Sequence, residues 1–380
     1  MQKLKITLAI TAVIAIITVI SVKVSGNAGD NFCLMKSYDY YKANFMSEDG
    51  RIIDYEKNDV TTSEGQSYMM LRSLIMEDKK TFDKVFMWSK YNLQQNGKLF
   101  GWLWGKNEMG EYKLLDNNSA SDADVDIATA LLLAYEKWGS YYYLEEALNI
   151  IRAIWDEETK QIDGHLVLMP GYKQAMDEKN ELNPSYFSPY SFRLFQKYDE
   201  LHDWNMLIDS SYYFLNKATS ATKTGLPPNW FVIKDGNVLL DNSERSDFSY
   251  DAVRVFARIY IDYKESGEKR AKPILEKSKF FVSKWKTERK MYTNYKYNGE
   301  LRDKNEYPGS IAILIPAINL YNKKIAEEIY TQKLEPYVEN PINWRNKKDY
   351  YSKNLVWFGL YLYQDKIKGC DIKSEVIDGK

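Results

Sequence analysis

The amino-acid sequence predicts an all-α fold in which many antiparallel helices form one large domain behind an N-terminal membrane anchor. Three observations predict it: an apolar run near the N-terminus, apolar residues spaced three and four apart along most of the chain, and no convincing run of alternating apolar and polar residues. A chain of 380 residues is long enough for two average domains, but a barrel of helices often fills such a length as one unit. We therefore expect a single helical domain.

The first expected element is the apolar run Ile6–Val22, which follows Lys3 and Lys5 and ends at Lys23. The run is too long for most cleaved signal segments and slightly short for a membrane span. Positive charge before it and a large polar domain after it favour an uncleaved anchor with the following domain outside the cell; a cleaved signal peptide is the alternative. We expect residues 1–5 in the cytoplasm, 6–22 in the membrane and 23–35 as a linker, with the protein at the cell membrane or secreted if the signal is cleaved.

Helical periodicity then repeats with turn residues between the segments. The segments with apolar positions three and four apart are Gln66–Met76, Val125–Trp138, Tyr141–Trp155, Ser188–Tyr198, Trp204–Ala218, Ala252–Tyr263, Lys272–Trp285, Ser310–Tyr321 and Leu355–Tyr363. Two breaks, Phe100–Trp104 and Gly225–Phe231, are aromatic and are predicted to be loops at a binding face. Roughly ten to twelve such helices can close as a toroid of inner and outer helices or stack as an open solenoid. We assign residues 36–368 to this domain and 369–380 to a tail.

Closure of the toroid would bring the two ends of the domain together. Cys33 and Cys370 lie near opposite ends of the chain, and an exported protein meets an oxidising environment. A disulfide between them is one hypothesis, and two unpaired thiols are the other.

Composition excludes several classes of partner. Lys+Arg 52 against Asp+Glu 53 gives a net charge of -1, so nucleic acid is not an expected partner. Two His and two Cys are too few for a Cys/His zinc site, and we expect neither a metal nor a cofactor. Aromatic residues make up 15% of the chain, with 31 Tyr and 10 Trp. Some of these rings are expected to stack on a flat ligand such as a sugar.

Acidic residues gather at three predicted helix starts, the first of which is Ser63-Glu64-Gly65-Gln66. Ser63 and Gln66 fit a capping box, which places Glu64 at the first helical position. Glu64 is then either an ordinary anion at the positive end of a helix or a group with a chemical role. The apolar surroundings of this helix and the room left by Gly65 favour the chemical role.

The second start carries Asp122, Asp124 and Asp126, more carboxylates than capping needs, and helical phasing puts Asp124 close to the apolar stripe. The alternatives are a solvated acidic turn or a weak calcium loop. At the third start, Asp251 and Arg254 share one helix face. A neighbouring cation keeps a carboxylate ionised, as a general base requires, although such a pair alone is more often an ordinary surface ion pair.

Taken together, these helix starts resemble glycoside hydrolase family 8 from about Tyr38 to Tyr363. The motifs that carry the resemblance are Ser63-Glu64-Gly65-Gln66-Ser67-Tyr68, Ala120-Ser121-Asp122-Ala123-Asp124 with Ile127-Ala128 and Trp138, Asn183-Pro184-Ser185-Tyr186, and Tyr250-Asp251-Ala252-x-Arg254. The resemblance implies an (α/α)6 barrel that cleaves β-1,4-linked glucans, xylans or chitosan with inversion. It implies Glu64 as general acid, Asp251 as general base and Asp122 as the group that holds and distorts the sugar. Met69-Met70 departs from the small residue expected there and puts the substrate length in doubt.

The implied roles agree with the electrostatics expected of the site. Burial among rings and repulsion from Asp122 raise the pKa of Glu64 by more than a helix N-terminus lowers it. Inversion needs a water between base and sugar, with the carboxyls roughly 6.5–9.5 Å apart. The further candidates for substrate binding are Trp102, Trp104, Tyr186, Trp230, Tyr250, Asp124 and Arg254, of which Arg254 is expected chiefly to orient Asp251.

The function expected from these observations is endo-hydrolysis of a cellulose-like β-1,4-glucan at the cell surface. The same fold acting on xylan or chitosan is the nearest alternative. A non-catalytic polysaccharide-binding or secretion protein is the alternative from another class, and the intact Glu64 and Asp251 argue against it. The expected partners are the polysaccharide, the membrane and the machinery of polysaccharide synthesis or secretion.

Overall fold

The computed structural model describes residues 28–95, 98–338 and 349–363. The predicted anchor at residues 6–22, the tail at 369–380 and the hypothesised bridge between Cys33 and Cys370 lie outside the part whose side chains are described. Within the described ranges, no helix is long and apolar enough to cross a membrane. Helix α2 (Ala28–Phe45) begins inside the segment that was predicted to be a linker.

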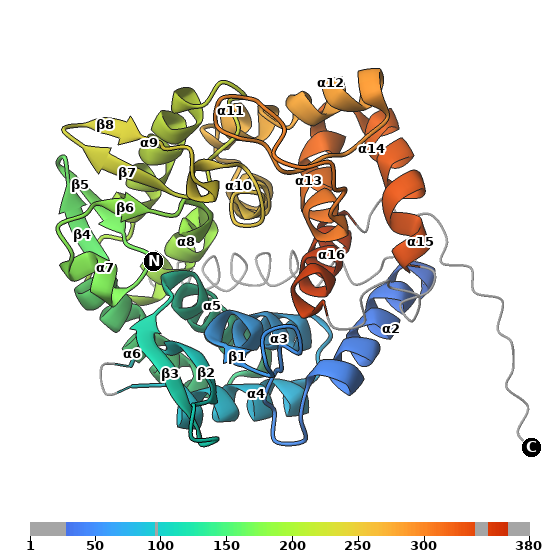
Figure 1. The fold of residues 1–380 in the computed structure, drawn as a ribbon. Coiled ribbons are helices and arrows are strands. Elements are labelled where there is room, and N and C mark those ends of the chain that lie inside the picture. The colour runs from blue at the N-terminus through green and yellow to red at the C-terminus, as the bar shows by residue number, and fades with distance from the viewer. Residues whose placement is uncertain (1–27, 96–97, 339–348, 364–380) are drawn as a thin grey trace, which may run out of the picture.

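The helices form a closed ring of two layers (Figure 1). In the described part of the chain, inner and outer helices alternate along the sequence, as the toroid prediction requires. The inner helices are α3 (Ser63–Ile75), α5 (Ser121–Trp138), α8 (Pro189–Tyr198), α10 (Arg254–Ser266), α13 (Pro308–Tyr321) and α16 (Tyr350–Tyr363). The outer elements are α2, α4 (Lys79–Asn92), α6 (Tyr141–Glu158), α9 (Asn205–Ala221), α11 (Ala271–Glu276), α12 (Lys279–Glu288), α14 (Lys323–Ile329), the π-helical turn η3 (Tyr330–Leu334) and α15 (Glu335–Val338).

The inner helices are buried on most sides, which explains their apolar character. Helix α13 is apolar along its length and packs against α16, where Gly359 lies against the Ala312 backbone. The expected helix Lys272–Trp285 is two helices instead, because Lys277 and Ser278 form tight turns to the carbonyls of Ile274 and Leu275. Sequence periodicity found the other predicted helices, but it did not separate α11 from α12.

The ring is closed by contacts between α2 and α16, the first and last described helices. Trp357 Nε1 donates to the carbonyl of Leu34 at 3.0 Å, and Asn354 Nδ2 donates to Tyr41 Oη at 2.9 Å. Arg72 of α3 donates to Asn354 Oδ1 at 3.0 Å, which ties the next inner helix into the same joint. The domain is therefore a toroid and not an open solenoid.

Three small antiparallel sheets lie among the helix connections, so the expectation of a chain without strands was wrong. They consist of β1 (Thr61–Thr62), β2 (Gly101–Lys106) and β3 (Tyr112–Ser119); β4 (Thr159–Ile162) and β5 (His165–Leu168); and β6 (Glu181–Leu182), β7 (Phe231–Lys234) and β8 (Asn237–Leu239). The pairing of β2 with β3 is irregular around Leu103, which interrupts the alternation that sequence reasoning looks for. The supposed loop Phe100–Trp104 is mostly strand β2, and the supposed loop Gly225–Phe231 ends in β7.

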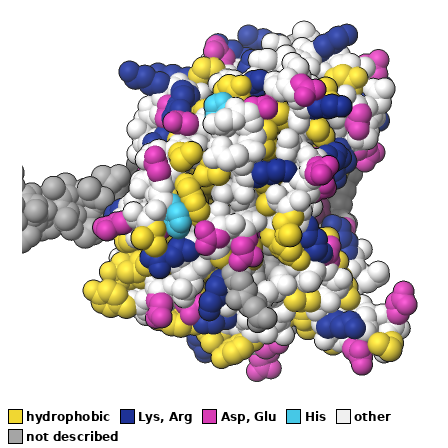
Figure 2. Space-filling view, turned by 90° about the vertical axis from the view of Figure 1, so that its left-hand side faces the viewer, with side chains coloured by type: hydrophobic (Ala, Val, Ile, Leu, Met, Phe, Trp, Pro, Cys, Tyr) yellow, Lys and Arg dark blue, Asp and Glu magenta, His cyan; other side chains and the backbone are white. Residues whose placement is uncertain are grey.

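The outer surface carries both signs of charge. In Figure 2, Lys and Arg side chains are interspersed with Asp and Glu over the visible face. This mixture agrees with the net charge of -1 and gives that face no single-sign field.

Candidate active site

The side chain of Arg254 joins the three carboxyl groups singled out from the sequence. Its Nη1 donates to Glu64 Oε2 at 2.6 Å and to Asp122 Oδ2 at 2.7 Å, and its Nη2 donates to Asp251 Oδ1 at 3.0 Å. Tyr68 Oη lies 3.1 Å from the same Nη1. The structure thus brings Glu64, Asp122 and Asp251 together around one cation.

The cluster is built from the N-terminal ends of three inner helices. Glu64 lies in the first turn of α3, Asp122 lies in the first turn of α5, and Arg254 is the first residue of α10. Asp251 lies in the turn just before α10, where its carbonyl accepts a hydrogen bond from the Arg254 amide at 3.0 Å. Inner helices of a toroid start at the same end, so residues far apart in sequence meet there.

The cap of α3 differs from the predicted capping box. Thr62 is the capping residue, and its Oγ1 accepts from the Gly65 amide at 3.0 Å. The Gln66 side chain instead accepts from the Ile52 amide and donates to Ser89 Oγ. Glu64 is consequently the second helical residue, and Gln66 anchors α3 to its neighbours.

Glu64 and Asp251 are the members of the cluster that reach solvent. Their side chains are 21% and 32% exposed, against 3% for Asp122 and 6% for Arg254. A polymer that approaches the cluster therefore meets Glu64 and Asp251 first.

Arg254 also limits how far apart these two carboxyls can be. The two Nη atoms of a guanidinium are held about 2.3 Å apart by its rigid plane, so Glu64 Oε2 and Asp251 Oδ1 lie within about 8 Å of each other. Inverting glycosidases hold their carboxyls roughly 6.5–9.5 Å apart and retaining ones roughly 5–5.5 Å apart. The limit set by Arg254 is compatible with the inverting and with the retaining separation. The anomer of the product distinguishes the two mechanisms.

The environment of Glu64 suits an acid that works near neutral pH. Burial raises its pKa, the Arg254 cation lowers it, and the negative charges of Asp122 and Asp251 raise it again; the result is a pKa of about 7. The direction and the contribution of Asp122 agree with the sequence-based expectation. At neutral pH a large fraction of Glu64 carries the proton that a general acid must donate.

Asp251 is held by donors on both of its oxygens. Asn183 Nδ2 and Trp230 Nε1 each donate to Asp251 Oδ2 at 3.1 Å, while Arg254 donates to Oδ1. These three donors hold the Asp251 carboxyl in one orientation beside Glu64. Sequence reasoning quoted Asn183 within a motif but gave it no role.

The rings predicted to bind sugar differ in how accessible they are. Tyr186, in the short helix η1 (Pro184–Tyr186), lies with its ring 5.6 Å from the Arg254 guanidinium and 6.0 Å from the Trp230 ring. Tyr250 is 40% exposed, and its ring lies 4.9 Å from that of Tyr307. Tyr186 and Trp230 thus lie at the cluster, and Tyr250 immediately precedes Asp251.

The two tryptophans of β2 have different surroundings. Trp102 is partly exposed and its side chain hydrogen-bonds to Asp116, so its role in sugar binding stays a prediction. Trp104 stacks on Tyr112 at 4.9 Å, contacts the edge of Trp88 and lies 4.6 Å from the Arg51 guanidinium. Trp104 therefore packs against protein groups but is partly exposed like Trp102, and its role in sugar binding also stays a prediction.

Asp124 also requires correction. Its side chain is fully buried, and its Oδ1 accepts a hydrogen bond from the Phe100 amide at 2.9 Å. It points toward the β2–β3 hairpin, so it contributes to packing and not to substrate binding. Sequence phasing correctly placed it near the apolar stripe but could not show which neighbour it meets.

Arg254 has a wider role than the one predicted, since it contacts Glu64 and Asp122 as well as Asp251. Two tyrosines at the site received no role from the sequence. Tyr68 lies one turn after Glu64 on α3, and Tyr351 of α16 donates its hydroxyl to the Tyr250 carbonyl at 3.1 Å. Tyr68 could have been found from the sequence, because it lies four residues after Glu64 on the same helix face. Tyr351 lies on α16, and no local spacing relates it to the site.

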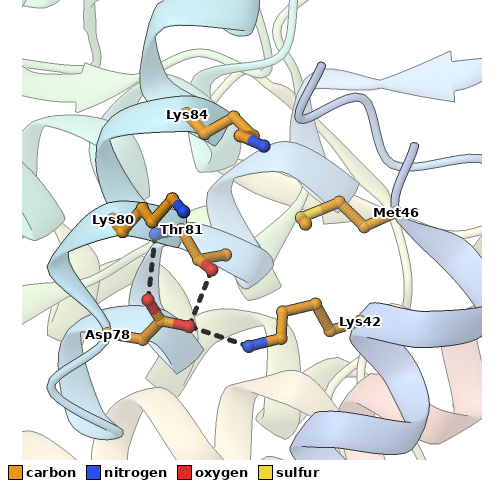
Figure 3. A pocket seen from close by; sticks show the side chains of 6 residues that line it. All are labelled: Lys42, Met46, Asp78, Lys80, Thr81 and Lys84. Carbon is orange, nitrogen blue, oxygen red and sulfur yellow. Dashed lines mark hydrogen bonds and ion pairs between the residues drawn. The ribbon is translucent and has the colours of Figure 1, made fainter. Parts of the chain in front are cut away.

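A separate surface pocket of about 340 Å³ lies between α2 and α4 (Figure 3). Its lining residues are Lys42, Met46, Asp78, Lys80, Thr81 and Lys84. Lys42 pairs with Asp78 at 2.9 Å, and Lys84 donates to the Glu48 carbonyl at 2.7 Å. It holds a single carboxyl group and no member of the Arg254 cluster, so it offers no acid and base pair for hydrolysis.

A helical barrel that presents two carboxyls, one with a raised pKa and one held by three hydrogen-bond donors, defines a carboxyl-dependent glycoside hydrolase. The particular family follows from comparison of the whole chain with known proteins. Residues 6–365 match the model of Glycosyl hydrolases family 8, and the chain belongs to that family. The match confirms the resemblance drawn from the motifs and the (α/α)6 barrel that it implied.

Similar proteins include enzymes named for β-glucan cleavage. Over 232 residues the chain is 33% identical to an endoglucanase of Escherichia coli K12; the match covers 59% of this chain and 61% of that protein, less than two thirds of its length. The endo-1,4-D-glucanase structure from Vibrio fischeri ES114 has a TM-score of 0.73 at 26% identity and covers 87% of this chain and 95% of its own. A beta-1,3-1,4-glucanase from Paenibacillus sp. X4 has a TM-score of 0.75 at 23% identity, covers 89% and 93%, and shows the shared fold.

Proposed function

We propose that this protein hydrolyses internal β-1,4 bonds of a cellulose-like β-glucan with inversion of the anomeric centre. The observation that carries the proposal is the Arg254 cluster, in which Glu64 has a pKa of about 7 and Asp251 accepts three hydrogen bonds. Membership of the family and the endoglucanases among its relatives support β-1,4-glucan as the substrate.

In the proposed reaction, Glu64 donates its proton to the oxygen of the departing sugar. Asp251 takes a proton from a water molecule as that water attacks the anomeric carbon from the opposite face of the ring. The glycosidic bond breaks, a bond to the water oxygen forms, and the pair ends with Glu64 ionised and Asp251 protonated. Arg254 stays in contact with both carboxyls, so the cation stabilises the charge that develops on Glu64.

Asp122 is proposed to hold the sugar at the cleavage point. It is the buried carboxyl of the cluster, on α5, and shares Arg254 Nη1 with Glu64. Its negative charge also raises the pKa of Glu64, so it supports the acid even before substrate arrives.

The test is release of reducing ends from soluble β-1,4-glucan by the full-length chain. Glu64→Gln and Asp251→Asn preserve side-chain shape and are expected to lower kcat by at least about a thousandfold, whereas Glu145→Gln, on the exposed outer side of α6, retains activity. Xylan and chitosan are assayed alongside. Equal rates for the wild type and both carboxyl variants on every polymer would refute hydrolysis by this cluster.

The stereochemistry has its own measurement. NMR of the first products from a β-linked oligosaccharide is expected to show the α-anomer before mutarotation, because inversion places the new hydroxyl opposite the cleaved bond. Initial appearance of the β-anomer would assign Asp251 a nucleophilic role instead.

We further propose that residues 6–22 hold the protein in the cell membrane with the barrel outside the cell. The apolar run after Lys3 and Lys5 supports this topology. A tether at the surface would also bring the barrel close to the machinery of polysaccharide synthesis or secretion. When cells that express the full chain are fractionated, the protein is expected in the membrane fraction with the mass of the uncleaved chain. Protease added outside intact cells is expected to digest the barrel. A shorter protein released into the medium would indicate a cleaved signal.

A further inference from the structure

A second pair of carboxyl groups is buried behind the Arg254 cluster and takes no part in the proposed reaction. Asp124 lies on α5, two residues after Asp122, and Glu158 is the last residue of α6. Both side chains are 0% exposed. Within the described residues, neither carboxyl makes an ion pair with a Lys or Arg side chain.

One oxygen of each carboxyl accepts a hydrogen bond from the protein. Asp124 Oδ1 accepts from the Phe100 amide at 2.9 Å, and Glu158 Oε1 accepts from Ser119 Oγ at 2.5 Å. The remaining oxygens, Asp124 Oδ2 and Glu158 Oε2, have no donor among the described groups.

The two carboxyls meet at the same end of the β2–β3 hairpin. Phe100, the donor to Asp124, precedes Gly101, and Gly101 is paired with Ser119, the donor to Glu158. The two side chains also interact with each other. An ionised carboxyl is only an acceptor, so two ionised carboxyls could not bond and would repel in this apolar setting. A single proton between Asp124 and Glu158 gives each remaining oxygen a partner.

We propose that Asp124 and Glu158 share one proton between Oδ2 and Oε2 and that this bond positions the first turn of α5, and with it Asp122, against the β2–β3 hairpin. The bond would act on the reaction only through Asp122, so this inference rests on the proposed function. Asp124 and Glu158 are thus positioning residues.

The connections of the pair explain how it would position the site. Phe100 immediately precedes β2, and Ser119 is the last residue of β3, so the two carboxyls hold the two strands at the open end of the hairpin that carries Trp102. Ser119 Oγ also accepts from the Tyr172 amide at 2.9 Å, at the start of α7 (Tyr172–Met176). The shared proton would join these contacts to α5.

The charged groups around the pair favour retention of the proton. The largest charge effects on the two carboxyls from outside the pair come from Asp122 and Glu157, both acidic, while the hydrogen-bond donors to the pair are Phe100 and Ser119. Burial and these negative charges raise the pKa of both carboxyls well above their ordinary values.

The first experiment counts the proton without using turnover. Unfolding of the full-length chain by denaturant is followed between about pH 5 and pH 7, above the ordinary carboxyl pKa of about 4. A folded state that keeps one proton lost on unfolding becomes less stable as pH rises, so the folding equilibrium constant of the wild type should fall about tenfold per pH unit relative to the Asp124→Asn/Glu158→Gln double variant. Equal slopes would mean no retained proton, and a relative fall of about a hundredfold per unit would mean two; either result overturns the proposal.

The second experiment tests positioning by kinetics. Glu158→Ala leaves Asp124 Oδ2 without a partner and the Ser119 hydroxyl without its acceptor, and it should lower kcat about tenfold with a smaller change in KM. Glu158→Gln supplies a permanent donor and should restore kcat to within about threefold of the wild type, and the matched control is Glu157→Gln, an exposed neighbour. Wild-type kcat in Glu158→Ala, or failure of Glu158→Gln to recover it, would contradict the positioning role. If the wild type itself shows no turnover, the proposed function fails while the proton count still stands.

Discussion

Arg254 Nη1 donates to Glu64 Oε2 across 2.6 Å, although Glu64 is the carboxyl that must keep a proton in order to act as an acid. The cation favours the ionised form, and burial together with Asp122 and Asp251 favours the protonated form. The two influences leave the pKa at about 7, so Glu64 can hold a proton before the reaction and be stabilised as a carboxylate afterwards.

The pH dependence of turnover should report this balance. A general acid is active while protonated, so kcat/KM on soluble β-1,4-glucan should fall to half near pH 7 and then drop about tenfold per pH unit as Glu64 ionises. The measurement is initial rate at low substrate concentration from pH 5 to pH 9, with folding checked by circular dichroism at each pH. Activity that stays level up to pH 9 would show that Glu64 is not the titrating acid.

Replacement of Arg254 should shift the pH at which kcat/KM falls to half. The cation lowers the pKa of Glu64, so Arg254→Gln should raise that pKa and shift the midpoint of the residual activity above pH 7, with kcat lowered at least about a hundredfold. Arg254→Lys keeps a positive charge but loses the planar fork, so its midpoint should stay closer to that of the wild type. A shift to lower pH in Arg254→Gln would contradict the electrostatic account.

Trp230 should affect the base through one hydrogen bond. Trp230→Phe keeps an aromatic ring but removes the Nε1 donor to Asp251 Oδ2, and hydrogen bonds to charged groups contribute about 1.5–3 kcal/mol, so kcat should fall about ten- to a hundredfold. KM should change by less than kcat, because most of the stacking surface remains. Trp230→Ala removes the ring as well and should raise KM further. If Trp230→Phe retained wild-type kcat, the indole donor would have no role at the base.

The closest approach of two inner helices should be sensitive to a single methyl group. A Cβ at Gly359 would lie 2.3 Å from the Ala312 carbonyl carbon, so Gly359→Ala should force α13 and α16 apart and lower the free energy of unfolding by about 1–3 kcal/mol. Gly309→Ala is the matched comparison, since its nearest contacts would be 3.1 Å and its cost should be smaller. Denaturant unfolding of both variants gives the ranking, and a larger loss for Gly309→Ala would contradict this packing.

Much of the candidate site could be anticipated because its residues lie at helix starts. Local sequence singled out the helix starts that carry Glu64, Asp122 and Asp251, and the ordered family motifs gave these residues their expected roles; the toroid brings them to one end of the ring. Arg254 was paired correctly with Asp251, since the two are three residues apart. Its contacts with Glu64 and Asp122 span 190 and 132 residues, and no local spacing reports such contacts.

Other roles depended on the partner that each side chain meets. Trp104 and Trp102 look alike in sequence, yet Trp104 packs against Trp88, Tyr112 and Arg51. Asp124 looks like a member of the acidic cluster, yet it faces Phe100 and Glu158. Strand β2 also escaped detection, because its irregular pairing removes the period of two.

The sequence by itself determined the helical class and the helix starts that carry the three carboxyls, because apolar spacing and short motifs act over a few residues. It left closure of the ring open except through the family resemblance, and the contacts between α2 and α16 decided it. Only the tertiary structure decided that a single guanidinium joins these carboxyls, that Asn183 and Trp230 hold the base, and that Asp124 turns away toward Glu158. The physical reason is that the pKa and the orientation of a carboxyl group depend on the burial, charges and donors within a few ångströms of it. Those neighbours are supplied by other helices of the barrel.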